Sequence, residues 1–225
     1  MKVDVGGYSL FVRCTGQGSP PAVFDAGANV GHSAWSLVEP KVAAFTRTCV
    51  YDRATLENSD EGPTPNTSQQ IVHDLHTLLS KMQLAGPFVL VGHSFGGMNM
   101  GLYARVYPTE AAGLVMVDAA HEASYLLGRG PTAPHQVSRG VDHTESARQV
   151  QAAPPMPAIP LIVIAHGLPG GVPFPEAQWH AWQQDLASRS PHSKLVVAEQ
   201  SNHEIESDQP DPVVAAVQEI VQQVR

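Results

Sequence analysis

The stretch Gly92-His93-Ser94-Phe95-Gly96-Gly97 decides the fold, because the sequence changes character on its two sides. Before it, the apolar run Phe88–Val91 predicts a buried strand. After it, residues 98–107 predict a helix that Pro108 would end. A serine between two glycines at a sharp turn from strand to helix is typical of a nucleophile elbow. The sequence therefore predicts that Ser94 is a nucleophile.

The same turn predicts how negative charge on a reacting group would be stabilised. Glycine on both sides of the serine lets strand and helix approach each other, and the serine backbone at such a turn is strained. The start of the following helix directs N–H groups and the positive end of its dipole toward the serine. We expect the N–H of Phe95, the residue after the nucleophile, to be one donor to an oxyanion.

Composition limits the classes of protein to consider. The chain has 225 residues, 43% hydrophobic and 15% charged, which is typical of one globular domain. Its net charge is −8 and no basic cluster stands out, which argues against nucleic acid or an anionic membrane as partner. No apolar run reaches the length of a membrane span, and Met1–Gly7 lacks the apolar centre of a signal peptide. We expect a soluble protein, cytoplasmic or secreted after removal of a signal peptide.

Strand-like and helix-like segments alternate from about residue 20 onward, which favours an α/β fold. Residues 67–70 resemble a capping box that opens a helix, and residues 213–224 have the apolar periodicity of a final helix. Beyond the elbow strand, we predict an opening hairpin of Val3–Val5 and Tyr8–Arg13, and strands at 21–27, 46–51, 113–118, 159–165 and 194–198.

The segment 119–158 has no clear strand and is rich in Pro, Gly and His. We expect short helices around Glu122–Leu127 and Ser138–Gln151. Ligands of open α/β sheets bind outside the carboxyl ends of the strands, where this insertion would begin and end. It is therefore placed to act as a lid over Ser94, although a surface excursion without substrate contact is the alternative.

Three motifs resemble the α/β-hydrolase superfamily, and in particular its small esterase-type members. They are Tyr51-Asp52-Arg53, the elbow Gly92–Gly97, and Leu114–Asp118. The resemblance covers nearly the whole chain. It implies one domain over residues 1–225, an eight-stranded and mostly parallel sheet with helices on both faces, and a short lid between the sixth and seventh strands. It also implies a catalytic triad in the order serine, acid, histidine.

His203 resembles the catalytic histidine of the superfamily, because it lies just past the last predicted strand and ahead of the final helix. Imidazole titrates near neutral pH, so it can accept the serine proton and return it to the leaving group. We interpret His93, inside the elbow, as a packing residue. The remaining histidines are not spaced as metal ligands, so we expect no metal site.

The acid of the triad is open between two residues. Superfamily members usually carry an Asp in the loop after the seventh strand, but here residues 166–175 contain no carboxylate. Glu176 is the first acid after that loop. Asp118, at the end of the sixth strand, occupies a position that some members use instead. We favour Asp118 and keep Glu176 as the alternative.

The second oxyanion donor is expected in the loop after the third strand. Ala26–Asn29 takes the place of the superfamily's His-Gly-x-Pro, which points to Ala28 or, through its side-chain amide, to Asn29. An ordinary glycine turn is the alternative. The loop Ala54–Asn58 departs from its counterparts in relatives, so no substrate preference follows from the resemblance.

These residues together predict a serine hydrolase that cleaves a small-molecule carboxylic ester through an acyl-enzyme and needs no cofactor. A lactonase, thioesterase, amidase or perhydrolase with the same triad is the nearest alternative. A ligand receptor that keeps the fold without turnover is the alternative from another class.

The two cysteines, Cys14 and Cys49, bear on localisation. In the superfamily sheet the second strand lies antiparallel beside the fourth, so these cysteines could face each other and form a disulfide. Two reduced, buried thiols are the alternative. A disulfide would favour an exported protein, because disulfides are rare in the cytosol.

Overall fold

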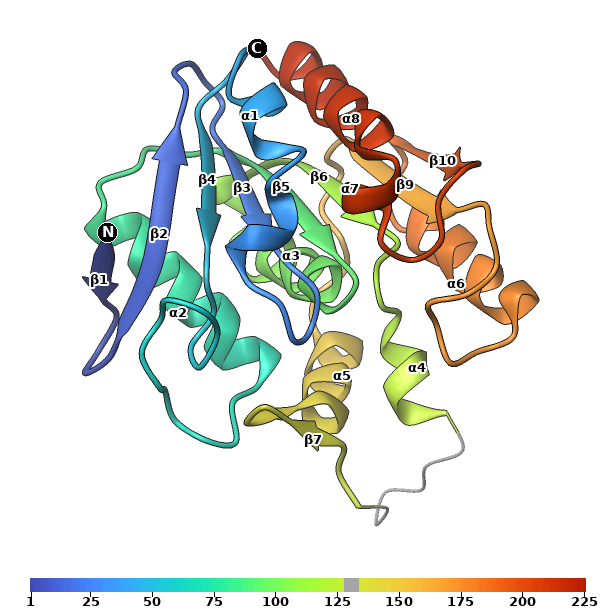
Figure 1. Ribbon diagram of the computed structural model, residues 1–225, viewed down its shortest axis with the longest axis horizontal. Helices are drawn as coiled ribbons and strands as arrows, with labels where there is room; N and C mark the ends of the chain where they lie inside the picture. The colour runs from blue at the N-terminus through green and yellow to red at the C-terminus, as the bar shows by residue number, and fades with distance from the viewer. Residues whose placement is uncertain (128–133) are drawn as a thin grey trace.

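The centre of the computed structural model, which describes residues 1–127 and 134–225, is an eight-stranded sheet (Figure 1). Its strands are β1 (Lys2–Asp4), β2 (Ser9–Thr15), β3 (Ala22–Asp25), β4 (Thr48–Tyr51), β5 (Phe88–His93), β6 (Ala111–Val117), β9 (Leu161–His166) and β10 (Ser193–Ala198). Their order is β1-β2-β4-β3-β5-β6-β9-β10. β2 is antiparallel to β1 and β4, whereas the other neighbours are parallel. The expected eight-stranded, mostly parallel sheet is confirmed.

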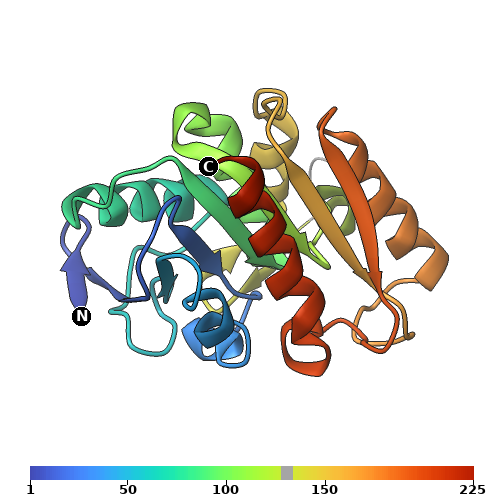
Figure 2. The same ribbon diagram turned by 90° about the horizontal axis from the view of Figure 1, so that it is seen from above.

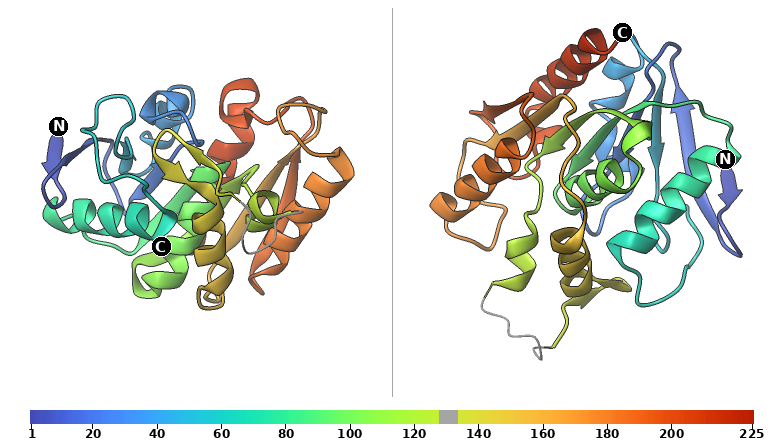
Figure 3. Two further views of the ribbon diagram at one scale, coloured as in Figure 1. Left: turned by 90° about the horizontal axis from the view of Figure 1, so that it is seen from below. Right: turned by 180° about the vertical axis from the view of Figure 1, so that it is seen from behind.

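Helices cover both faces of this sheet. They are α1 (Glu39–Val42), α2 (Ser68–Lys81), α3 (Phe95–Val106), α6 (Glu176–Ser188), α7 (Ile205–Asp208) and α8 (Pro210–Gln223), with short 3-10 turns η1 (His32–Trp35) and η2 (Pro108–Glu110). Seen from the front and from above, α1 and α8 lie over one face (Figures 1 and 2). Seen from behind, α2, α3 and α6 lie in front of the other face (Figure 3).

Each face of the sheet has its own hydrophobic core. Leu90 of β5 belongs to the cluster that contains Leu75 of α2, and its neighbour Val91 belongs to the cluster that contains Val217 of α8. Successive side chains of a strand point to opposite faces, so a strand buried on both sides reads as a continuous apolar run. This explains why Phe88–Val91 has no polar residue.

The segment between β6 and β9 contains α4 (Glu122–Leu126), the small hairpin of β7 (Val137–Ser138) and β8 (Val141–Asp142), and α5 (His143–Ala152). In Figure 1 it lies beyond the end of the sheet toward which the arrows of β3 and β4 point. The prediction of a helix starting at Ser138 was wrong. α5 begins later, because the Asp142 side chain caps it by accepting a hydrogen bond from the Glu145 N–H at 2.8 Å.

The capping box predicted at residues 67–70 was also wrong. Thr67 is the N-cap of α2, but its side chain makes no capping hydrogen bond. Side chains of α5 accept from the first amides of α2 instead: Ser146 Oγ from the Ser68 N–H and Gln149 Oε1 from the Gln69 N–H, both at 2.9 Å. The start of α2 is therefore satisfied by tertiary contacts that no local pattern encodes.

The expected disulfide is present. Cys14 of β2 lies opposite Cys49 of β4 in the antiparallel register, and the two residues are joined by a disulfide bond. Within the described residues, no helix has the length and apolarity that crossing a membrane would require.

Candidate active site

Ser94 occupies the turn between β5 and α3, as the sequence predicts. Its backbone lies in the left-handed region, with φ 51° and ψ −121°. The two flanking glycines are required by close approach of the backbone. A Cβ on Gly92 would lie 2.4 Å from the Gly96 carbonyl oxygen, and a Cβ on Gly96 would lie 2.4 Å from the Ala26 carbonyl oxygen. Only glycine fits at these positions without moving the backbone.

The loop after β10 brings His203 against this serine. His203 Nε2 lies 3.0 Å from Ser94 Oγ, so the hydroxyl can donate its proton to the ring. On the other side of the ring, Nδ1 lies 2.6 Å from Asp118 Oδ2. The structure thus brings together the three residues Ser94, His203 and Asp118, which come from distant parts of the chain.

Asp118 directly follows β6, and its side chain is completely buried. Oδ1 accepts hydrogen bonds from Trp179 Nε1 at 2.9 Å and from the His166 N–H at 3.2 Å. Burial alone would raise the pKa of this carboxyl, but hydrogen bonds from His166, His203 and Trp179 outweigh burial and lower the pKa to about 2. The carboxylate therefore stays ionised at neutral pH, where it can orient an imidazole.

Glu176, the alternative acid, contacts a different histidine. It is the first residue of α6, and its Oε2 lies 2.7 Å from His166 Nε2. The His166 hydrogen bond lowers the pKa of the Glu176 carboxyl. His166 Nδ1 in turn lies 2.7 Å from Asp118 Oδ2. Among the described contacts, Glu176 reaches Ser94 and His203 through His166 and Asp118.

His166 and Trp179 are the site residues that the sequence reasoning missed. His166 is the last residue of β9 and its side chain is fully buried, next to Asp118. A polar residue that ends an otherwise apolar strand at the carboxyl edge of the sheet was the available signal. Trp179 lies inside α6, and the sequence offers nothing that separates it from the other core tryptophans.

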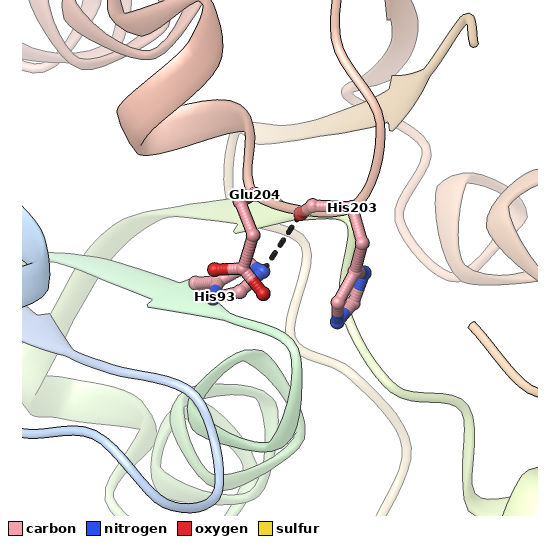
Figure 4. A group of neighbouring side chains, drawn as sticks. All are labelled: His93, His203 and Glu204. Atoms are coloured by element: carbon pink, nitrogen blue, oxygen red, sulfur yellow. Dashed lines mark hydrogen bonds between the residues drawn. The ribbon is translucent and has the colours of Figure 1, made fainter. Parts of the chain in front are cut away.

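His93 supports the loop that carries His203. Its Nε2 lies 2.9 Å from the His203 carbonyl oxygen, and the Glu204 carboxylate lies beside the ring (Figure 4). On the other side of the ring, Nδ1 lies 3.0 Å from the fully buried Glu206 Oε1. Burial would lower the pKa of His93, but the Glu206 charge outweighs it and raises the pKa. Nε2 of His93 thus contacts a backbone carbonyl and Nδ1 faces a carboxylate.

Phe95 and Ala28, the expected oxyanion residues, both lie next to the side chain of Arg53. Phe95 is the first residue of α3, a position whose N–H has no acceptor within the helix. Ala28 is half-buried in the loop after β3, whereas Asn29 is exposed. The guanidinium of Arg53 lies 5.7 Å from the centre of the Phe95 ring.

Arg53 also fixes the loop that contains Ala28. Its guanidinium donates to the carbonyl oxygens of Ala26 at 2.7 Å, Gly27 at 2.5 Å and Ala28 at 3.2 Å, and it pairs with buried Asp25. The carbonyl and N–H of a trans peptide point in opposite directions. Because the Gly27 carbonyl points at Arg53, the N–H of Ala28 points away from it, out of the buried side of the loop.

Two neighbouring hollows share lining residues, and Ser94 lines the smaller of them. The smaller, of about 160 Å³, is lined by Ser94, Ala120, Ser124, Tyr125, Gln136, Gly171, Val172, Pro173, Phe174, Trp179 and His203. The larger, of about 480 Å³, is lined by Ala28, Tyr125, His135, Gln136, Val137, Ser138 and His143. Tyr125 and Gln136, from the segment between β6 and β9, border both.

Comparison with known proteins places this geometry in context. A family model described as "Alpha/beta hydrolase family" matches residues 22–187. A protein of Hormonema carpetanum, described as "Probable transporter efuK", is 30% identical over 131 residues, which are 55% of this chain and 19% of that protein. The chain therefore spans about one fifth of the length of that curated relative.

Two solved structures share the fold over their full length. A thermophilic esterase from Thermogutta terrifontis, with malate bound, has a TM-score of 0.77 at 20% identity, covering 100% of this chain and 99% of the esterase. The enol-lactonase from Burkholderia xenovorans LB400 has a TM-score of 0.76 at 17% identity, covering 99% of this chain and 100% of the lactonase. At these identities the likeness is one of fold.

Proposed function

Because the chain belongs to the alpha/beta hydrolase family, we propose that it hydrolyses carboxylic esters through an acyl-enzyme formed on Ser94. The observation that carries the proposal is the continuous line of contacts from Ser94 Oγ to His203 Nε2 at 3.0 Å and from His203 Nδ1 to Asp118 Oδ2 at 2.6 Å. A serine is a weak nucleophile until a base accepts its proton, and a base acts best when a third group orients it.

The chemistry runs in two halves. Ser94 Oγ attacks the acyl carbon while its proton passes to His203 Nε2, and the resulting tetrahedral intermediate collapses as His203 returns that proton to the departing alcohol. Water then replaces the alcohol and repeats the sequence, which releases the acid and restores the serine. Asp118, with its pKa lowered to about 2, remains ionised throughout and stabilises the imidazolium that forms.

The N–H groups of Phe95 and Ala28 are our assigned donors to the oxyanion. The support for Phe95 is its position as the first residue of α3, next to the nucleophile. The support for Ala28 is the orientation of its loop, whose carbonyls face Arg53. The Ala28 carbonyl also faces Arg53, so the Asn29 N–H points the same way; we favour Ala28 because it is half-buried whereas Asn29 is exposed.

The described parts of the segment between β6 and β9, up to residue 127 and from residue 134, are proposed as the lid over the reacting groups. Tyr125 and Gln136 of these parts line both hollows, and Ser94 lines the smaller one. The smaller hollow, of about 160 Å³, suits a short acyl group, so p-nitrophenyl acetate is the first substrate to test. A lactone, a thioester and an amide complete the panel, because the same triad can act on each.

The test of the proposal is covalent labelling with a fluorophosphonate, followed by turnover of this panel. We expect stoichiometric labelling of the wild type, and we expect Ser94→Ala to abolish labelling and to lower ester turnover by about 10⁴-fold or more. Ser124→Ala is the matched control, because Ser124 lines the same hollow and should leave labelling intact. Undiminished turnover in Ser94→Ala would refute the mechanism, and labelling without turnover of any substrate would favour a ligand receptor.

A further inference from the structure

The buried carboxylate of Asp118 serves two imidazoles at one oxygen atom. Oδ2 lies 2.6 Å from His203 Nδ1 and 2.7 Å from His166 Nδ1. The triad as proposed uses only the first of these contacts. The side chains of Asp118 and His166 are both fully buried, so their contact lies in the interior and not on the solvent-exposed surface.

The hydrogen-bond partners of the His203 and His166 rings indicate which ring nitrogens can carry protons. His203 faces a carboxylate at Nδ1 and a hydroxyl at Nε2, so a neutral ring with its proton on Nδ1 satisfies both contacts. His166 faces a carboxylate at each nitrogen, Asp118 at 2.7 Å and Glu176 at 2.7 Å. Ionised carboxylates only accept hydrogen bonds, so both nitrogens of His166 must carry protons. One oxygen of Asp118 thus serves both the imidazole that contacts Ser94 and the charged imidazole of His166.

The ionisation of His166 agrees with this count. The hydrogen bond to Asp118 raises the pKa of His166, burial opposes that effect, and the hydrogen bond to Glu176 adds to it, so that the pKa rises to about 9. At neutral pH two carboxylates, Asp118 and Glu176, therefore flank one imidazolium, that of His166.

We propose that His166, held as an imidazolium between Asp118 and Glu176, is a positioning residue that shares Asp118 with His203 and sets the lower pH limit of the activity. This inference rests on the proposed function, because the activity in question is the serine-dependent hydrolysis. His166 acts through Asp118 and is not assigned a contact with substrate.

The direction of the effect follows from the charges that face His166. These are Asp118 from the end of β6, Glu176 and His180 from α6, and His203 across the shared oxygen; the His180 ring centre lies 5.2 Å from that of His166. Hydrolysis needs His203 in its neutral form. A fixed positive charge nearby opposes protonation of His203, so it extends the activity toward acidic pH.

The first test is the pH dependence of kcat/KM, which reports the ionisation of the free enzyme. In His166→Gln the imidazolium is lost but a hydrogen-bond donor remains. We expect the acidic limb of the kcat/KM profile, where activity falls as the pH is lowered, to move up by roughly 0.5–1.5 pH units. In Glu176→Gln the contact with Asp118 still keeps His166 protonated while one nearby negative charge is lost, so the acidic limb should stay or move down. His73→Gln, an exposed site on α2, is the matched control and should change nothing.

An unmoved or lowered limb in His166→Gln would overturn the proposal, and so would a Glu176→Gln limb that rises as far as that of His166→Gln. The second outcome would mean that the two residues only hold the fold together. If wild type hydrolyses no substrate of the panel, the proposed function fails. If it does hydrolyse one but the limbs do not separate, only the present inference fails.

The second test does not depend on variants that fold poorly. In wild-type protein labelled with ¹⁵N-histidine, NMR should show both ring nitrogens of His166 protonated at pH 7. The signal is assigned by its absence in His166→Gln, and its titration midpoint should fall in Glu176→Gln. A neutral His166 ring at pH 7 would overturn the inference whatever the kinetics show.

Discussion

The choice between Asp118 and Glu176 depends on which ring nitrogen each carboxylate reaches. Both acids follow a strand of the sheet, and neither residue type nor distance along the chain separates them. Asp118 Oδ2 lies 2.6 Å from His203 Nδ1, whereas Glu176 Oε2 lies 2.7 Å from His166 Nε2. The sequence could name both candidates and favour Asp118. It could not show why Glu176 contacts a different histidine, because His166 lies beside Asp118 only once β6 and β9 have paired.

At this scale we expect the two acids to respond differently to loss of charge. Asp118→Asn should keep the fold and lower kcat by roughly 10³–10⁴-fold, because the amide cannot stabilise the imidazolium and favours the wrong tautomer of His203. Glu176→Gln should lower kcat by less than about 10-fold, since Glu176 contacts neither reacting residue. Steady-state kinetics with p-nitrophenyl acetate measures both. A large loss in Glu176→Gln with none in Asp118→Asn would move the acid to α6.

At the scale of elements, the strands were predictable from apolar runs, whereas the segment that covers the site was not. The inner strands β3, β4, β5, β6 and β9 are buried on both faces, so each appears in the sequence as a short, mainly apolar run. The start of α2 depends instead on Ser146 and Gln149 of α5, which lie far along the chain. The same holds for Arg53, whose motif was recognised but whose three carbonyl contacts with residues 26–28 were not foreseen.

Arg53 offers a test of how the oxyanion loop is held. Arg53→Lys keeps the charge beside Asp25, but an ammonium group cannot spread its donors over three carbonyls as a guanidinium does. We expect a folded protein whose kcat falls by roughly 10–100-fold, because a loosened donor stabilises the oxyanion less well. Arg13→Lys is the matched control, since Arg13 of β2 pairs with Glu39 of α1, away from the serine. Wild-type kcat in Arg53→Lys would separate Arg53 from the oxyanion hole.

At the scale of the whole molecule, four adjacent strands each deliver one polar residue to the same edge. Ser94 follows β5, Asp118 follows β6, His166 ends β9, and His203 lies in the loop after β10. Parallel strands end at a common edge, so residues far apart in the chain converge there. The sequence alone shows four strand ends. Their order in the sheet, and so the contact between His166 and His203 through Asp118, required either the family resemblance or the structure.

The disulfide lies in another part of this sheet, and its contribution belongs to stability. It joins β2 to β4, which β3 separates from β5 and the serine. Closing a loop between residues separated by 35 positions restricts the unfolded chain, which corresponds to about 3–4 kcal/mol in the chain-entropy description. We therefore expect the double variant Cys14→Ala/Cys49→Ala to lose up to that amount of unfolding free energy, measured by urea denaturation, and to keep wild-type kcat/KM below the transition.

Reducing the Cys14–Cys49 disulfide of the wild type provides the control for the double variant, because it breaks the S–S bond and keeps both sulfur atoms. Unfolding of the wild type in the presence of dithiothreitol should approach that of the double variant, whereas the double variant itself should not respond to the reductant. Alanine is the suitable replacement because Cys49 is buried and a serine there would bring an unpaired hydroxyl into the core. If the wild type unfolds at the same urea concentration with and without reductant, the link between β2 and β4 does not stabilise the fold. In that case the sheet edge is held by strand pairing and by the packing of the core alone.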